Sequence, residues 1–162
     1  MILNRQRQVR VSIHELELFL SRALRLVRLP AGAIGVCFVT NVQIARWNRA
    51  YRGKKSPTDV LSFPANAPQR ARRKSKSRAK PGAAPTRRAS RPSESLDSYL
   101  GDIAIAPAVA RKNARRFGRA FSDEMRILIL HGILHLLGYD HETDSGQMDR
   151  REARLRRALD LV

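Results

Sequence analysis

Apolar side chains recur every three or four residues in five stretches of the chain, a spacing typical of helices that bury one face. Residues 12–15 (Ser-Ile-His-Glu) have the form of a capping box at the start of the first stretch, and Pro30 ends it. Gly53, Gly118 and Gly138 follow three of the other stretches, where a left-handed residue commonly ends a helix. The predicted helices span about residues 12–29, 40–52, 107–117, 122–137 and 148–162.

Three shorter runs, at residues 34–39, 60–63 and 100–105, are rich in β-branched and apolar residues and predict strands. These runs do not alternate regularly with the helices, so a parallel βαβ fold is not indicated. A chain of 162 residues fits one hydrophobic core. We therefore expect an α+β fold in one domain, residues 1–162, with a small mixed sheet of about four strands packed with about five helices.

A basic segment at about residues 67–98 interrupts the pattern. Between residues 67 and 92 there are ten Lys or Arg, no acidic residue and almost no large apolar side chain. Such a composition buries too little surface to offset its ordering entropy, so we expect a disordered insert within the single domain. The insert carries much of the net charge of +18, and the rest of the chain remains basic. This charge favours a polyanionic partner such as nucleic acid.

The single cysteine, Cys37, excludes an internal disulfide framework and indicates a reducing compartment. Its apolar surroundings predict a buried, inert thiol. The first ten residues do not have the form of a secretory leader, and the longest uncharged apolar run, residues 127–137, is shorter than the roughly 20 residues that span a bilayer. We expect a cytoplasmic protein without a membrane partner.

Three of the four histidines, His131, His135 and His141, fall within eleven residues. His131 and His135 are four positions apart on a predicted helix, so both rings lie on one face and can reach one metal ion. Gly138 can end the helix and turn the chain back, which brings His141 to the same ion. One such histidine alone would more commonly be a core residue, but three at this spacing predict a metal site at the end of the helix. The remaining one, His14, is not expected to bind metal.

The expected ion is Zn2+, one per chain. Three imidazoles leave a tetrahedral zinc ion with one open position, as in catalytic sites. Iron sites of the facial-triad type also need a carboxylate ligand, while nickel and manganese remain alternatives. The spacing matches the metzincin protease motif, except that Gly132 replaces the glutamate that acts as general base. Because glycine cannot transfer a proton, the pattern indicates a substrate other than a peptide.

The segment from His131 to His141 resembles the motif His-Gly-x-Leu-His-Leu-x-Gly-Tyr-Asp-His of the YbeY endoribonuclease family at every fixed position. Residues 51–64 (Tyr-Arg-Gly-Lys-Lys-Ser-Pro-Thr-Asp-Val-Leu-Ser-Phe-Pro) resemble its second motif, and residues 100–103 (Leu-Gly-Asp-Ile) its third. Two departures are Ser56, where many members carry a charged residue, and the long basic insert. The resemblance implies a single-strand-specific, metal-dependent endoribonuclease. Its expected roles are maturation of the 3′ end of small-subunit ribosomal RNA and ribosome quality control.

The resemblance also implies roles for particular residues. His131, His135 and His141 would be the zinc ligands, and Arg52 the basic residue important for RNA cleavage. A guanidinium matches phosphate oxygens and can stabilise charge that develops on a phosphoryl group. The expected partners are single-stranded regions of ribosomal RNA and the ribosomal small subunit or its assembly factors.

Asp140 and Asp102 are candidates for orienting a ligand imidazole or a water molecule, although aspartates are also common in turns. Thr58 and Asp59 fit a simple turn before a strand.

Two other functions stay open at this point. A metallopeptidase with a displaced general base would place a glutamate, such as Glu124 or Glu142, beside the zinc-bound water. A non-catalytic RNA-binding ribosome assembly factor, in which zinc only stabilises the fold, would have a fourth protein ligand that closes the metal site.

Overall fold

The computed structural model describes residues 1–65, 99–141 and 144–161. The predicted basic insert at about residues 67–98 lies outside these residues, as does Glu142. Helices and strands are mixed along the chain, as an α+β fold requires. In chain order the elements are β1 (Ile2–Asn4), α1 (Ile13–Leu26), β2 (Ile34–Phe38), α2 (Asn41–Arg52), β3 (Val60–Pro64), β4 (Gly101–Ile105), α3 (Pro107–Arg116), α4 (Phe121–Leu136) and α5 (Gln147–Ala158).

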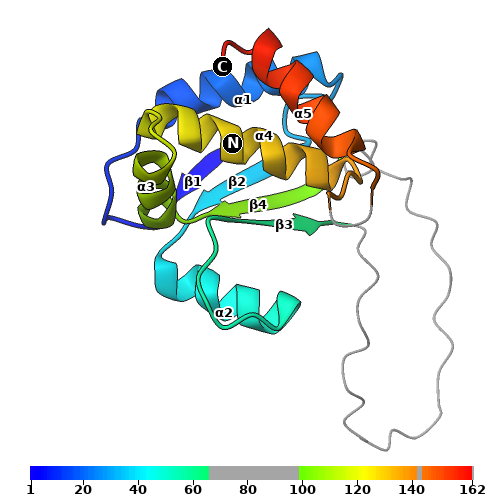
Figure 1. Cartoon of the computed structure of the whole chain (residues 1–162). Coiled ribbons are helices and arrows are strands. Elements are labelled where there is room, and N and C mark those ends of the chain that lie inside the picture. The colour runs from blue at the N-terminus through cyan, green and yellow to red at the C-terminus, as the bar shows by residue number, and fades with distance from the viewer. Residues whose placement is uncertain (66–98, 142–143, 162) are drawn as a thin grey trace, which may run out of the picture.

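The four strands form one mixed sheet in the order β1-β2-β4-β3. β1 runs parallel to β2 and β2 parallel to β4, whereas β3 and β4 are antiparallel. Helices α1, α4 and α5 lie on one side of the sheet and α2 on the other (Figure 1). The predicted single α+β domain with a small four-stranded sheet and five helices is therefore confirmed.

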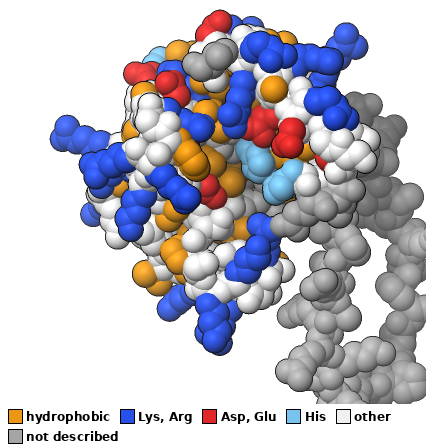
Figure 2. All heavy atoms as spheres, in the orientation of Figure 1, with side chains coloured by type: hydrophobic (Ala, Val, Ile, Leu, Met, Phe, Trp, Pro, Cys, Tyr) orange, Lys and Arg blue, Asp and Glu red, His pale blue; other side chains and the backbone are white. Residues whose placement is uncertain are grey.

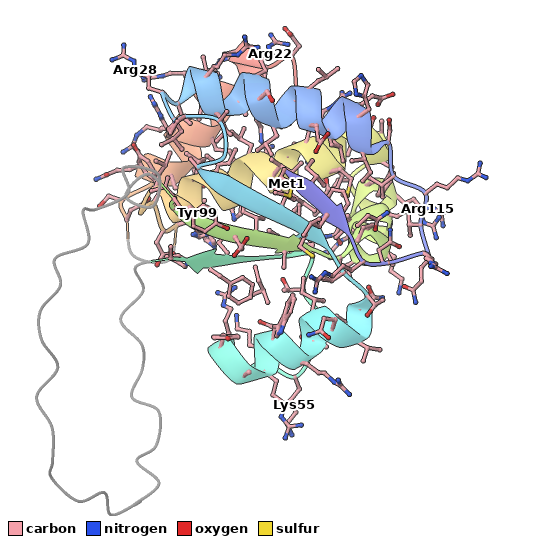
Figure 3. All side chains as sticks on the ribbon, turned by 180° about the vertical axis from the view of Figure 1, so that it is seen from behind. Met1, Arg22, Arg28, Lys55, Tyr99 and Arg115 are labelled. Atoms are coloured by element: carbon pink, nitrogen blue, oxygen red, sulfur yellow. The ribbon has the colours of Figure 1, made fainter. Side chains whose placement is uncertain are left out.

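Helix α4 is the central element of the larger core. Met125, Ile129 and Ile133 are almost fully buried along it, because they face the sheet and α1. A smaller core on the other side of the sheet includes Ile44 of α2 and Leu61 of β3. Side chains fill the space on both sides of the sheet (Figure 3). His131 and His135, the predicted metal ligands on this helix, are thus carried by an element that packs against both the sheet and α1.

Most predicted helix ends lie within one or two residues of those in the structure, but α1 ends at Leu26 and α5 at Ala158, three and four residues earlier than predicted. Thr40 caps α2 by accepting a hydrogen bond from the Gln43 backbone N–H, and Gly53 ends that helix with a φ of 70°. Ser12 stands before α1, but its side chain makes no capping hydrogen bond. The predicted capping box is therefore wrong, and the Glu15 carboxylate lies 3.9 Å from the Arg126 guanidinium instead.

The fourth helix also differs from its prediction at one end. It begins at Phe121 after Ala120, slightly before the predicted start at Ser122, because Asp123 and Glu124 donate their backbone N–H groups to the carbonyl of Ala120. β1 was not predicted at all, since three residues are too few to show a strand pattern.

β3 and β4 form a hairpin from which the basic insert departs. Pro64 pairs with Gly101, and the Ala65 N–H donates to the Leu100 carbonyl at 2.8 Å. Tyr99 lies where the chain returns to the sheet (Figure 3). The residues on either side of the insert are therefore paired with each other in the sheet. Among the described residues, the helices are too short or too polar to cross a membrane.

Candidate metal centre

His131 and His135 lie one turn apart on α4, on the side of the helix that faces away from the core. Both side chains are partly exposed, whereas Ile133 and Leu134 between them are fully buried. The two Nε2 atoms are 3.1 Å apart, and the ring centroids are 4.7 Å apart. The helix therefore aims one nitrogen of each ring at a common point, as the spacing of four predicted.

The chain turns at the end of α4 and brings His141 to the same point. Gly138 takes a φ of 88°, and its backbone N–H donates to the His135 carbonyl at 3.0 Å. The His141 ring centroid lies 5.6 Å from that of His131 and 5.4 Å from that of His135. One nitrogen from each ring falls within 4.8 Å of the others, so this group can hold a metal ion. The structure thus brings the three sequence-predicted histidines together.

The nitrogen spacing fits a tetrahedral ion. Zinc–nitrogen bonds of about 2.0–2.1 Å with tetrahedral angles place ligand nitrogens roughly 3.3 Å apart. The Nε2 atoms of His131 and His135 already lie close to this separation. The histidines occupy a hollow in the surface, with acidic side chains on one side and basic side chains on the other (Figure 2). His131 and His135 therefore fit a single ion without a change in the path of the helix, and the His141 nitrogen lies within 4.8 Å of both.

Glu152 of α5 holds the His131 ring from its other side. Its Oε2 atom lies 2.9 Å from His131 Nδ1, and its Oε1 atom accepts a hydrogen bond from Arg156. A carboxylate at Nδ1 favours the tautomer that keeps the proton there, which leaves Nε2 free to bind metal. Glu152 was not among the residues predicted from the sequence. One feature of the sequence could have identified it: Glu152 lies on the same helix face as the apolar residues Met148 and Leu155. A charged side chain on a buried face needs a partner of opposite charge or a hydrogen bond.

The neighbouring groups shift the pKa values of His135 and Glu152 in directions that favour cation binding. Burial lowers the pKa of His135 below its ordinary value, and the neighbouring His131 and His141 rings lower it further. Burial alone would raise the pKa of the Glu152 carboxyl, but the hydrogen bond from His131 and the charge of Arg156 outweigh it and lower this pKa. His135 is therefore neutral and Glu152 ionised near neutral pH, which are the states that metal binding requires.

A cleft of about 680 Å³ opens beside His135. Its walls are the end of α2, strand β3 and the turn after α4. Arg52 of α2, predicted from the sequence, lines this cleft together with His135 and Asp140. The full lining is Tyr51, Arg52, Val60, Leu61, Ser62, Phe63, Pro64, His135, Gly138, Tyr139 and Asp140. A histidine that can bind metal, a guanidinium and exposed aromatic surface thus share one cavity.

α4 passes close to the sheet at Gly132. A Cβ atom at this position would lie 2.7 Å from Cγ2 and 2.8 Å from Cδ1 of Ile103, a fully buried residue of β4. The position that carries the catalytic glutamate in metzincin proteases therefore faces the core and has no room for a side chain. The packing, as well as the chemistry, argues against restoring a protease base here.

The other predicted acidic residues have different surroundings. Asp140 lines the cleft, and its charge acts to raise the pKa of His135. Asp102 accepts a hydrogen bond from the Tyr99 hydroxyl at 2.6 Å, and it is not among the described residues that line the cleft. Asp59 accepts a hydrogen bond from Asn113, which ties the turn before β3 to α3. Glu124 is buried two turns before His131, with Arg119 at 3.3 Å.

Comparison with known proteins gives consistent matches over this whole arrangement. The family model described as Endoribonuclease YbeY matches residues 1–160. The Endoribonuclease YbeY of Koribacter versatilis is 35% identical over 161 residues, which cover 99% of this chain and 86% of that protein. That of a Sulfurovum species is 36% identical over 119 residues, which cover 74% and 67% of the two chains. A Thermotoga maritima protein solved in solution shares the fold, with a TM-score of 0.54, 23% identity and coverage of 98% and 89%.

Proposed function

The chain belongs to the YbeY endoribonuclease family, and from this membership we propose that it cleaves single-stranded regions of ribosomal RNA with one zinc ion held by His131, His135 and His141. The reaction is hydrolysis of an RNA phosphodiester bond. The observation that carries the proposal is the convergence of three histidine nitrogens, within 4.8 Å of one another, beside a cleft that Arg52 also lines. Such a site offers both a metal position and a cation for phosphate.

Zinc is favoured by the donor set. The group consists of three imidazoles among the described residues, and nitrogen donors in a tetrahedral arrangement suit zinc. The bound ion would supply Lewis acidity and an activated water at the open position. Glu152 fixes the His131 ring so that Nε2 points at the ion. The remaining surface of the cleft is available to the RNA.

Arg52 has a separate task in this proposal. Negative charge grows on the non-bridging oxygens of a phosphodiester in the transition state, and a guanidinium can stabilise it with two parallel hydrogen bonds. Arg52 stands at the last position of α2, so its side chain reaches into the cleft from a rigid helix. The histidines and Arg52 would thus act on one phosphate from different walls of the cleft.

In the cell, we propose maturation of the 3′ end of the small-subunit ribosomal RNA and a part in ribosome quality control, in the cytoplasm. The partners would be the ribosomal small subunit or its assembly factors. The net charge of +18 supports a polyanionic partner of this kind.

The two rival functions lack the residues they need within the described chain. A metallopeptidase would need a glutamate on the open side of the metal, but Glu152 lies on the Nδ1 side of His131 and Glu124 lies beside Arg119. Glu142, the other candidate base, lies outside the described residues. A purely structural zinc site would have a fourth ligand, whereas this group of described residues has three members.

Metal content and cleavage test the proposal together. His135→Ala should lower bound zinc well below one ion per chain and abolish cleavage of a structured RNA with single-stranded tails. His14→Ala, which changes an exposed histidine on α1, is the control and should keep both properties. Stoichiometric zinc with unchanged affinity in His135→Ala would refute the site, and an inactive but zinc-loaded native protein would refute the endoribonuclease.

A further inference from the structure

Tyr51 exposes an aromatic ring at the mouth of the cleft. Its relative exposure is 66%, and it precedes Arg52 on the last turn of α2. The large apolar side chains that are exposed in the described part of the chain are Met1, Leu3, Leu18, Leu26, Val42, Tyr51 and Phe117. Among these, Tyr51 is the one that lines the cleft of His135. An exposed aromatic ring therefore lies in the same cleft as His135.

Other aromatic side chains hold this ring in place. The Tyr51 ring packs edge to face against Phe63, with centroids 5.2 Å apart and planes at 75°. Phe63 packs in the same manner against Trp47 at 5.7 Å, and both contribute to the core between α2 and the sheet. Tyr51 is thus anchored on one side and open on another. A ring that is already positioned loses little conformational entropy when a flat ligand stacks on it.

The neighbouring groups match the parts of a nucleotide. Proteins that bind single-stranded nucleic acid combine a cation for the backbone with aromatic rings on which bases stack. Tyr51 and Arg52 provide these two features from adjacent positions, and both line the same cleft. A volume of about 680 Å³ lies within the roughly 300–1,000 Å³ range of small-molecule sites, so the cavity has room for a nucleotide.

We infer that Tyr51 is the stacking platform for one unpaired nucleobase, next to the phosphate that Arg52 and the metal centre engage. The inference rests on the proposed function and names the part of the RNA that the site selects. A base in a duplex is already stacked and paired, and presenting it to Tyr51 would require its extrusion at additional energetic cost. An unpaired base meets the ring freely. Tyr51 would therefore contribute directly to the preference for single-stranded RNA.

Binding of a non-hydrolysable RNA analogue to the metal-loaded protein tests the inference without cleavage. The probe is a fluorescent, single-stranded form of this analogue. Tyr51→Leu keeps an apolar side chain but removes the ring, and it should weaken binding by about 5- to 100-fold, the usual range for one stacked base. Tyr51→Phe keeps the ring and should bind nearly as well as the native protein. The same loss for Phe and Leu would assign the effect to the hydroxyl and overturn the inference.

Phe117→Leu is the matched control. Phe117 is 55% exposed, and the guanidinium groups of Arg116 and Arg119 lie over its ring at 5.7 and 4.9 Å. It lies before the start of α4, whereas His135 lies near the end of that helix, about 21 Å along its axis from Phe121. The control thus removes an exposed aromatic ring with arginine neighbours away from the cleft. An equal loss of affinity in Phe117→Leu would show only general RNA adhesion and overturn the inference.

Abasic substitution of the probe locates the stacked base. For the native protein, removal of one particular base should weaken binding about as much as Tyr51→Leu does. In Tyr51→Leu, removing that base should cost little more, since ring and base act as one pair. Independent losses that multiply would overturn the inference. The metal-loaded native protein is assayed for cleavage in parallel, so that failure to cut RNA refutes the proposed function while the binding cycle still tests the stacking.

Discussion

The Nδ1 atom of His131 on α4 lies 2.9 Å from the Oε2 atom of Glu152 on α5, 21 residues further along the chain. The contact joins a ring that faces the candidate metal position to a carboxylate that is mostly buried. Arg156 bonds the other carboxylate oxygen and helps to keep the group ionised. The arrangement fixes the position of His131 and leaves its Nε2 atom directed at the other two histidines.

Glu152→Ala should therefore weaken zinc binding by about 10- to 100-fold, as expected when the partner of a ligand histidine is lost. Glu152→Gln retains a hydrogen-bond acceptor without its charge and should give an intermediate affinity. Competition with a chromophoric chelator measures the affinity, and circular dichroism checks the fold. Glu15→Ala, which removes an exposed glutamate, should leave the affinity unchanged. Native affinity in a folded Glu152→Ala protein would contradict the assigned role.

Arg52→Ala should lower cleavage by on the order of a hundredfold to a thousandfold while keeping the metal and the fold. The expected loss is in the rate of the chemical step, so single-turnover assays at saturating enzyme are the appropriate measurement. Arg52→Lys should recover only part of the rate, since it keeps the charge but loses the planar pair of donors.

Arg49→Ala provides the comparison for Arg52, because Arg49 is an exposed arginine one turn earlier on α2 and outside the described cleft lining. We expect it to cause only a modest loss of RNA affinity that added salt suppresses. Equal turnover in Arg49→Ala and Arg52→Ala would mean that Arg52 contributes only to the positive charge of the surface and not to the chemical step.

Replacement of residues 67–98 by two glycines should leave the fold intact and weaken RNA binding. The hydrogen bond from Ala65 to Leu100 and the pairing of Pro64 with Gly101 already close the hairpin, so a short turn can join the strands. The replacement removes ten basic side chains. The plot of log affinity against log salt concentration should become less steep, because fewer phosphates are neutralised.

A neutral Gly-Ser segment of the original length separates charge from length in the insert experiment. It should show the same shallow salt dependence as the two-glycine variant. An unchanged salt dependence in both variants would mean that the insert does not contact RNA.

Gly132→Ala tests the close approach of α4 to the sheet. Overpacking in a core costs about 1–3 kcal/mol, whereas replacing a helical glycine by alanine gains up to about 1 kcal/mol. With Ile103 at 2.7 Å from the added Cβ, we expect the free energy of unfolding to fall by up to about 2 kcal/mol. Urea denaturation measures this change.

The same substitution should change sign in an Ile103→Ala background. Ile103→Ala removes the side-chain atoms that the added methyl group would contact. The gain in helix propensity then remains, so the free energy of unfolding should rise by up to about 1 kcal/mol. Stabilisation by Gly132→Ala in both backgrounds would show that the contact with Ile103 does not limit the residue at position 132.

The features that the sequence predicted well are local ones. The pair His131 and His135 follows from helical periodicity, and the return of His141 follows from Gly138, which takes the expected left-handed conformation. The contact between Glu152 and His131 could not be derived in this way, because it depends on how α5 packs against α4. Ser12 illustrates another limit: a capping motif gives the start of a helix, but tertiary partners decide which hydrogen bonds form.

The four side chains at the candidate metal centre, His131, His135, His141 and Glu152, come from three segments: α4, the turn after it, and α5. An ion held by the three histidines would therefore join α4 to the turn after it, and the hydrogen bond between His131 and Glu152 would extend this link to α5. If the ion binds the folded chain more tightly than the unfolded one, its free concentration adds to the stability of the protein by mass action. The melting temperature would then report metal occupancy, and cells short of the metal would hold less of the folded enzyme as well as less of the active one.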